Sequence, residues 1–176
     1  MGIPSGAGDH LRRAALPKTM ISIREKLVLL SASGAGAGYF PLFPGTIGTL
    51  VAIPFSFALN HLANFSLALA GVTLVTAVFC AMGLASKASE MLRQKDPGVI
   101  VIDEIVGFLL ANFAAPNRVS VVLAAFILFR FFDIAKIFPA SRLEMLPGGA
   151  GIVLDDIMAG IYTFTIVQLL VAWQIL

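Results

Sequence analysis

The stretch Pro147-Gly-Gly-Ala-Gly-Ile-Val-Leu-Asp-Asp-Ile-Met-Ala-Gly160 decides how this chain is organised. Two adjacent carboxylates, Asp155 and Asp156, follow a run of glycines and open the last apolar segment, which continues to Leu176. An ionised carboxylate pair beside a membrane span is unfavourable unless a cation or hydrogen bonds compensate it, so the pair indicates a functional site. The alternative interpretation is an acidic helix start that complements the helix dipole. The stretch by itself does not separate these two interpretations.

The composition of the chain is that of a membrane protein. Its 176 residues are 59% hydrophobic and only 12% charged, and the mean hydropathy is +0.94. Ordinary soluble domains contain about 25% charged residues. The formal net charge of +2 is too small to indicate a nucleic-acid-binding protein, so we expect no nucleic-acid partner. Cys80 is the only cysteine, which excludes a disulfide framework and a cysteine-based metal site.

The apolar segments predict an all-α, membrane-embedded bundle of about five membrane helices. The expected spans are residues 47–62, 65–85, 99–115, 119–132 and 151–176. Residues 21–30 are mildly amphipathic and predict a short helix at the membrane surface. Residues 1–20 lack the apolar core of a signal peptide, so we expect a disordered tail followed by a single domain at 21–176. Thr46 is expected to cap the first span, and residues 60–65 are expected to form the loop after it.

The distribution of lysine and arginine predicts the orientation of the spans. Five of these residues lie in the N-terminal arm, three lie in the connector at 86–98 and two lie in the connector at 134–149. The opposite ends of the spans carry only Arg118. Because cytoplasmic loops are enriched in lysine and arginine, we expect the N-terminus in the cytoplasm. Five of the ten acids in the chain then gather at the cytoplasmic face: Asp103, Glu104, Asp133, Asp155 and Asp156.

These acids form the first candidate site, and its chemistry follows from the groups available. His10 lies in the tail and His61 in an outer loop, so histidine-based catalysis is not expected. Carboxylate oxygens are the ligands of hard cations such as Mg²⁺, which polarises phosphoryl oxygens and lowers the pKa of bound water. The predicted metal ligands are Asp103, Glu104, Asp155 and Asp156. The alternative is a structural role, in which the acids hold helices together through hydrogen bonds or through Arg130.

A glycine follows one acid of each pair by four residues. Gly107 follows Asp103, and Gly160 follows Asp156. Residues four apart share a helix face. A glycine on that face lets a neighbouring helix or a substrate come close to the carboxylate.

The second candidate site is the turn and helix start in Phe43-Pro-Gly-Thr-Ile-Gly-Thr49. A glycine-bearing turn that runs into a helix exposes unpaired backbone N–H groups, which bind phosphate. Thr46 and Thr49 are three residues apart, so both hydroxyls are able to face one ligand. Gly45, Thr46 and Thr49 are therefore predicted to bind the substrate. An ordinary capped helix start is the alternative interpretation.

The third candidate site is Phe129-Arg-Phe-Phe-Asp-Ile-Ala-Lys136. Arg130, Asp133 and Lys136 are spaced by three and line one helix face. Two cations with an acid between them are suited to hold a phosphate and a metal-bound water. A cluster of long side chains that form salt bridges at the membrane interface is the alternative.

Taken together, these passages resemble the phosphatidylglycerophosphatase A family. The matching motifs, in order, are Gly36-Ala-Gly38 with Pro44-Gly-Thr-Ile-Gly-Thr-Leu50, Asp96-Pro-Gly-Val-Ile-Val-Ile-Asp-Glu-Ile-Val-Gly107, Phe129-Arg-Phe-Phe-Asp-Ile-Ala-Lys136 with Pro139, and Gly148 to Gly160. The resemblance covers about residues 25–176, and four motifs in order are more specific than any one of them. The chain departs from the family at Ile137, where proline is usual.

The resemblance implies a multi-pass enzyme of the bacterial inner membrane that requires Mg²⁺. Such an enzyme removes the terminal phosphate of phosphatidylglycerophosphate, giving phosphatidylglycerol and inorganic phosphate. We therefore expect a metal-assisted lipid phosphatase with its active site facing the cytoplasm. Arg130 and Lys136 are expected to hold the phosphate, with Asp133 orienting Lys136 or the metal shell.

Two other functions are compatible with parts of the sequence. A small ion or proton transporter would use intramembrane carboxylates, but it needs polar residues along a path to the far side, and the outer halves of the spans are nearly all apolar. A lipid-headgroup transferase would place its acids close together in one run, which the chain lacks. The sequence predicts no oligomeric state.

Overall fold

The computed structural model describes residues 22–176, and this part of the chain is entirely helical. It contains α1 (Ile23–Ala32), the 3-10 helix η2 (Ala37–Tyr39), α2 (Pro44–Phe65), α3 (Leu67–Leu92), α4 (Ile102–Ala111), α5 (Val119–Ala135), α6 (Ala140–Leu143) and α7 (Gly149–Ala172). The prediction of an all-α fold is therefore confirmed. The expected tail at residues 1–20 lies outside the described residues.

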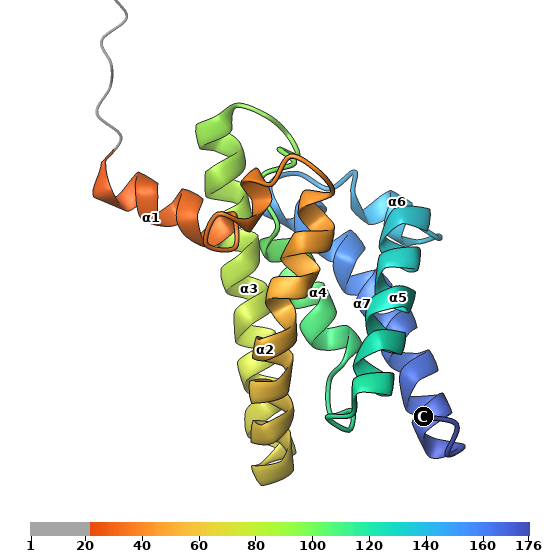
Figure 1. The fold of residues 1–176 in the computed structure, drawn as a ribbon. Helices are drawn as coiled ribbons and strands as arrows, with labels where there is room; N and C mark the ends of the chain where they lie inside the picture. Colours follow the sequence, from red (N-terminus) through yellow and green to blue (C-terminus); the bar gives the residue numbers. More distant parts are fainter. Residues whose placement is uncertain (1–21) are drawn as a thin grey trace, which may run out of the picture.

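The long helices stand side by side, and α1 crosses them near one end (Figure 1). Helices α2, α3 and α7 are long and apolar enough to cross a membrane. At 1.5 Å per residue, α4 is only about 15 Å long, or half of the roughly 30 Å hydrocarbon thickness. All five predicted apolar segments are thus helical, but only three of these helices have the length of a span.

The boundaries of α2 correct two expectations. The helix begins at Pro44, and Thr46 is not its cap, because the N–H of Thr46 already donates to the carbonyl of Phe43 (2.9 Å). Proline suits the first helical position, where no N–H partner is needed. The predicted loop at 60–65 is also wrong, since α2 continues to Phe65 and only Ser66 separates it from α3.

The start of α7 shows where Asp155 and Asp156 lie in the helix. The helix begins at Gly149, and its first turn contains no acid. Asp155 and Asp156 lie in its second turn, and both are buried. The interpretation of the pair as an acidic helix start is therefore wrong. A helix dipole stabilises charges chiefly within the first turn, so it is not what compensates these carboxylates.

Helix α4 lies at the centre of the fold and packs against α2, α3, α5 and α7. Its closest crossing is with α7, where two glycines meet. A Cβ atom on Gly160 would lie 2.6 Å from the carbonyl oxygen of Gly107, and a Cβ on Gly107 would lie 2.9 Å from the carbonyl oxygen of Asp156. The prediction that these glycines permit close helix approach is confirmed. Because both glycines follow an acid by one turn, the crossing brings the two acidic segments together.

Buried amides complete the hydrogen bonding where α4 ends inside the protein. The side-chain nitrogen of Asn60 donates to the carbonyls of Asn112 (2.9 Å) and Ala115 (3.1 Å), and Gln168 donates to the carbonyl of Phe113 (2.9 Å). A backbone carbonyl left unpaired at membrane depth is strongly unfavourable. These amides therefore allow a short helix to end between the longer ones.

Candidate active site

Three carboxylates meet where α4 crosses α7. Asp103 and Glu104 lie in the first turn of α4, and Asp156 lies opposite them on α7. One ligand oxygen from each lies within 4.8 Å of the other two, which is close enough for all three to hold a metal ion. Asp103 is 7% exposed and Asp156 is 3% exposed. We refer to Asp103, Glu104 and Asp156 as the acidic cluster.

The donor chemistry of the acidic cluster fits a hard divalent cation. Asp103 Oδ1 and Glu104 Oε2 are buried and accept no hydrogen bond from residues 22–176. Buried polar atoms normally have hydrogen-bond partners. Two buried carboxylate oxygens without such partners require a cation or protons to compensate their charge. All the ligand atoms are oxygens, which Mg²⁺ and Ca²⁺ prefer. The cluster could therefore bind a metal ion.

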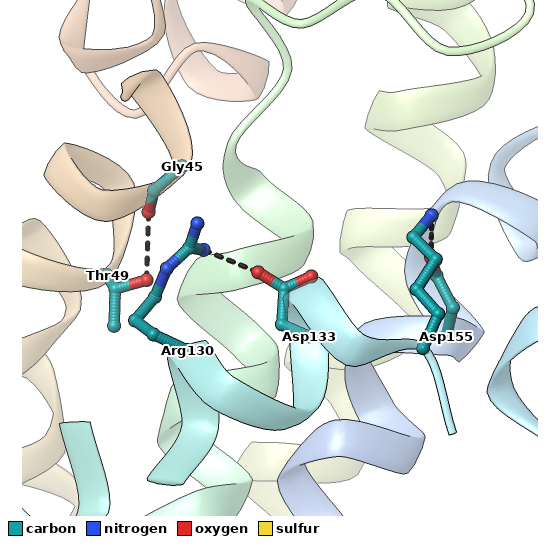
Figure 2. Close-up of polar contacts among 6 residues, drawn as sticks. Gly45, Thr49, Arg130, Asp133 and Asp155 are labelled. Atoms are coloured by element: carbon teal, nitrogen blue, oxygen red, sulfur yellow. Dashed lines mark hydrogen bonds and ion pairs between the residues drawn. The ribbon is translucent and has the colours of Figure 1, made fainter. Parts of the chain in front are cut away.

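Arg130 lies beside the acidic cluster and is held by Asp133. The guanidinium donates to the Asp133 carboxylate, both side chains come from α5, and both are largely buried (Figure 2). One guanidinium nitrogen, Nε, is buried and has no acceptor in the structure. Arg130 therefore has unused donor capacity next to the carboxylates.

The first turn of α2 closes the opposite side of this group. A Cβ atom on Gly45 would collide with Glu104 Oε1 and would lie 3.1 Å from Arg130 Nη1. Only glycine leaves room for the carboxylate and the guanidinium here. The N–H of Gly45 belongs to the first turn of the helix and has no partner within it. The structure thus brings Gly45, Arg130 and the acidic cluster together from four helices, α2, α4, α5 and α7.

The two predicted threonines differ in position. Thr46 is half-buried in the first turn of α2. Thr49 is fully buried, and its hydroxyl donates to the carbonyl of Gly45 at 2.8 Å, as Figure 2 shows. The hydroxyl of Thr49 is therefore committed to its own helix, one turn below the glycine.

Lys136 forms a second charged group, separate from the acidic cluster. It ends α5 in a left-handed backbone conformation (φ 44°), and its Nζ lies 2.9 Å from Glu144 Oε2 and 3.1 Å from Asp155 Oδ2. Burial opposes the charged ammonium, but the hydrogen bonds to Glu144 and Asp155 outweigh it and raise the pKa of Lys136 above its ordinary value. Asp155, although adjacent to Asp156, thus pairs with a lysine instead of joining the acidic cluster.

Glu144 is the residue of this site that the sequence analysis missed. It directly follows the short helix α6 and is a single acid in a connector, with no motif around it. Its contact with Lys136 depends on how the chain turns between α5 and α7. A pattern of neighbouring residues carries no signal for such a contact.

Comparisons with known proteins show the family to which this chain belongs. The pattern of the family described as Phosphatidylglycerophosphatase A matches residues 30–171. A relative from Haemophilus influenzae named Phosphatidylglycerophosphatase A is 35% identical over 161 residues, covering 90% of this chain and 97% of the relative. One of the same name from Escherichia coli is 34% identical over 134 residues, covering 75% of this chain and 76% of the relative.

A further relative carries a different name. A protein from Bacteroides thetaiotaomicron named "Putative phosphatidylinositol-3-phosphatase" is 35% identical over 145 residues, which is 80% of this chain and 91% of the relative. No solved structure matches the chain. All three names describe phosphatases, and the family pattern spans every element that builds the acidic cluster. This chain is therefore a phosphatase and belongs to the phosphatidylglycerophosphatase A family.

Proposed function

We propose that this protein hydrolyses the terminal phosphate monoester of phosphatidylglycerophosphate, releasing phosphatidylglycerol and inorganic phosphate. The observation that carries the proposal is the acidic cluster, whose unpaired carboxylate oxygens lie beside Arg130 and Gly45. Mg²⁺ is the proposed cation, held by Asp103, Glu104 and Asp156. When bound there, it would neutralise phosphoryl oxygens and lower the pKa of a water molecule.

The remaining residues have roles in binding and positioning the phosphate. The guanidinium of Arg130 and the N–H of Gly45 are the donors nearest the acidic cluster, and Thr46 adds a hydroxyl in the same turn. Asp133 orients Arg130 through their hydrogen bond. Transfer of a phosphoryl group needs mainly positioning and charge neutralisation, which such a set supplies.

Supporting roles are proposed for three residues outside the acidic cluster: Lys136, Asp155 and Thr49. Asp155 holds the ammonium of Lys136, which is proposed to attract the phosphate as it enters. Thr49 fixes the backbone carbonyl of Gly45 and thereby the turn that faces the phosphate. During hydrolysis the bond between phosphorus and the glycerol oxygen breaks, the water oxygen joins phosphorus, and the leaving oxygen takes up a proton. Asp103 is the proposed base for the attacking water.

The proposed setting is the bacterial inner membrane, with several membrane passes and the acidic cluster facing the cytoplasm. The support is the excess of lysine and arginine at the end of the bundle that carries the cluster. Among residues 22–176, the buried acids also lie only at that end, in the first turn of α4 and the second turn of α7. A transporter path would need polar groups continuing toward the far side, so the transporter alternative is not favoured.

Phosphate release from purified protein tests the proposal directly. Phosphatidylglycerophosphate, phosphatidate and phosphatidylinositol 3-phosphate should be compared side by side, each with Mg²⁺ and with EDTA. We expect release from phosphatidylglycerophosphate at the highest kcat/KM and its loss in EDTA. A higher kcat/KM on either other lipid would overturn the proposed substrate, and full activity in EDTA would overturn the proposed metal.

A further inference from the structure

Two apolar cavities form a continuous groove between α2 and α3. The first has a volume of about 360 Å³ and the second about 270 Å³. Phe55 and Leu109 line both, so the cavities adjoin. Phe55 and Cys80 are exposed, which means that the groove opens to the outside of the bundle. We refer to these joined cavities as the α2–α3 groove.

The dimensions of the α2–α3 groove match one leaflet of a bilayer. Its lining runs from Val51 to Leu62 on α2 and from Thr73 to Leu84 on α3. At 1.5 Å per residue, each run is about 16 Å long. The hydrocarbon core of a bilayer is about 30 Å thick, so one leaflet is about half of that. The groove follows the two helices, which Figure 1 shows side by side. Its length and direction are therefore those of an acyl chain.

The α2–α3 groove is separate from the acidic cluster. Ile102, Ile105 and Leu109 of α4 line the groove. Asp103 lies on the side of α4 that meets Asp156 of α7. The groove and the acidic cluster therefore occupy different faces of α4, and we assign to the groove a lipid other than the one whose phosphate reaches the carboxylates.

Cations lie at the α1 end of the groove. Lys87 is one turn beyond Leu84 on the same face of α3, and its ion pair with Glu90 is exposed and holds it weakly. Arg24 and Lys26 are exposed on α1, which packs against α3. Glu25, between them, is hydrogen-bonded to Ser22 in the helix cap. A phosphate above a chain in the groove would therefore lie at the end of α3 that carries Lys87, beside the basic helix α1.

We propose that the α2–α3 groove binds one acyl chain of an anionic glycerophospholipid whose phosphate contacts Lys87. This lipid is a resident of the protein and not its substrate. The groove supplies the apolar surface for the chain, and Lys87 supplies the preference for a negative headgroup. The proposal is independent of the hydrolytic activity.

Native mass spectrometry of the full chain in detergent tests this proposal. The protein is titrated with phosphatidylglycerol or with phosphatidylcholine of the same acyl chains. We expect one saturable phosphatidylglycerol adduct, with binding about fivefold weaker for phosphatidylcholine. Cys80→Trp fills the groove from its rim and should abolish the adduct. Val75→Trp places the same side chain on the exposed opposite face of α3 and should retain it.

Lys87→Gln should remove the headgroup preference while the chain still binds. Ala77→Phe, which also fills the groove, repeats the test if Cys80→Trp does not fold. Equal adducts in Cys80→Trp and Val75→Trp would overturn the site, and equal affinity of the wild type for the two lipids would overturn the role of Lys87. An adduct with the mass of a second protein chain, lost in Cys80→Trp, would show that the groove is a contact between copies instead.

Discussion

Asp155 and Asp156 are adjacent in the chain, but the α-helix directs their side chains to different partners. Successive residues on a helix point about 100° apart. Asp156 thus meets Asp103 and Glu104 of α4, whereas Asp155 meets Lys136, which also binds Glu144. The pair is therefore divided between the acidic cluster, which could bind a metal ion, and a salt bridge to Lys136. This division explains why both carboxylates are tolerated at a buried position.

Asp156→Asn should abolish hydrolysis while the protein remains folded. The substitution removes one of three negative charges in the acidic cluster, although the side chain keeps its size. Changing a residue that merely supports a metal ligand costs about 10–100-fold, so a direct ligand should cost at least about 100-fold in kcat/KM. Phosphate release measures the loss, and circular dichroism in detergent checks folding. Glu90→Gln, on the exposed surface, is the control. Normal turnover by Asp156→Asn would contradict the assignment.

Gly45→Ala should reduce activity by about a hundredfold, because displacement of catalytic groups by about 1 Å has effects of this size. The added methyl group would collide with the carboxylate of Glu104 and crowd the guanidinium of Arg130. Gly83→Ala is the matched control, since a Cβ there meets no atom within 4 Å and alanine favours the helix. Steady-state kinetics of both variants distinguish the two positions. Equal activities would show that the site tolerates a side chain at Gly45.

At the scale of elements, the crossing of α4 and α7 sets the geometry of the acidic cluster. The two helices approach at Gly107 and Gly160, so their backbones are in contact one turn beyond the acids. Helix α4 is able to take this central position because it is short and its end is bonded by amides from α2 and α7. By bonding the C-terminal end of α4, the polar residues Asn60 and Gln168 thus help to hold the helix that carries Asp103 and Glu104.

Asn60→Leu should destabilise the protein by about 2 kcal/mol, because the carbonyls of Asn112 and Ala115 lose a buried donor. Leucine fills similar space but offers no hydrogen. Asn64→Leu is the control, since Asn64 is exposed and should change the free energy of unfolding by less than about 0.5 kcal/mol. Unfolding in mixed detergent and denaturant gives both values. Similar values for the two variants would rule out the capping role of Asn60.

The salt bridges of Lys136 with Glu144 and Asp155 should lose their stabilising effect at alkaline pH. Its folded-state pKa lies above the ordinary lysine value of 10.5, so its contribution is complete below that pH and is lost as the pH rises through the folded-state pKa. The stability difference between wild type and Lys136→Met should be constant from pH 7 to about pH 10 and then shrink. Lys87→Met, at an exposed pair, should show a small difference throughout. A difference that grows above pH 10 would contradict the bridge.

At the scale of the whole molecule, the acidic cluster joins helices that are about fifty residues apart in the chain. A cation bound by α4 and α7 should therefore stabilise the entire bundle. At one hundred times its dissociation constant, a ligand that binds only the folded state adds about 2.7 kcal/mol. We expect Mg²⁺ to raise the Tm of the wild type but not of Asp156→Asn. An equal rise in both would mean that the ion acts elsewhere.

The apolar runs by themselves predicted helices suited to a membrane, because 59% of the 176 residues are hydrophobic, more than in typical soluble domains. They also placed the acids near the ends of those helices, since charges are excluded from the span interiors. The positions of Pro44 and Gly149 as helix starts were missed, since an element's end depends on caps and packing as well as on composition.

Only the tertiary structure decided which acids act together. From the sequence, Asp155 and Asp156 were equivalent, and Glu144 gave no signal at all. The close glycine crossing selects Asp156 for the acidic cluster, and the turn after α5 brings Lys136 and Glu144 to Asp155. Contacts between residues distant in the chain depend on how whole helices pack. Local spacing predicts which side chains share a helix face, but packing determines what that face meets.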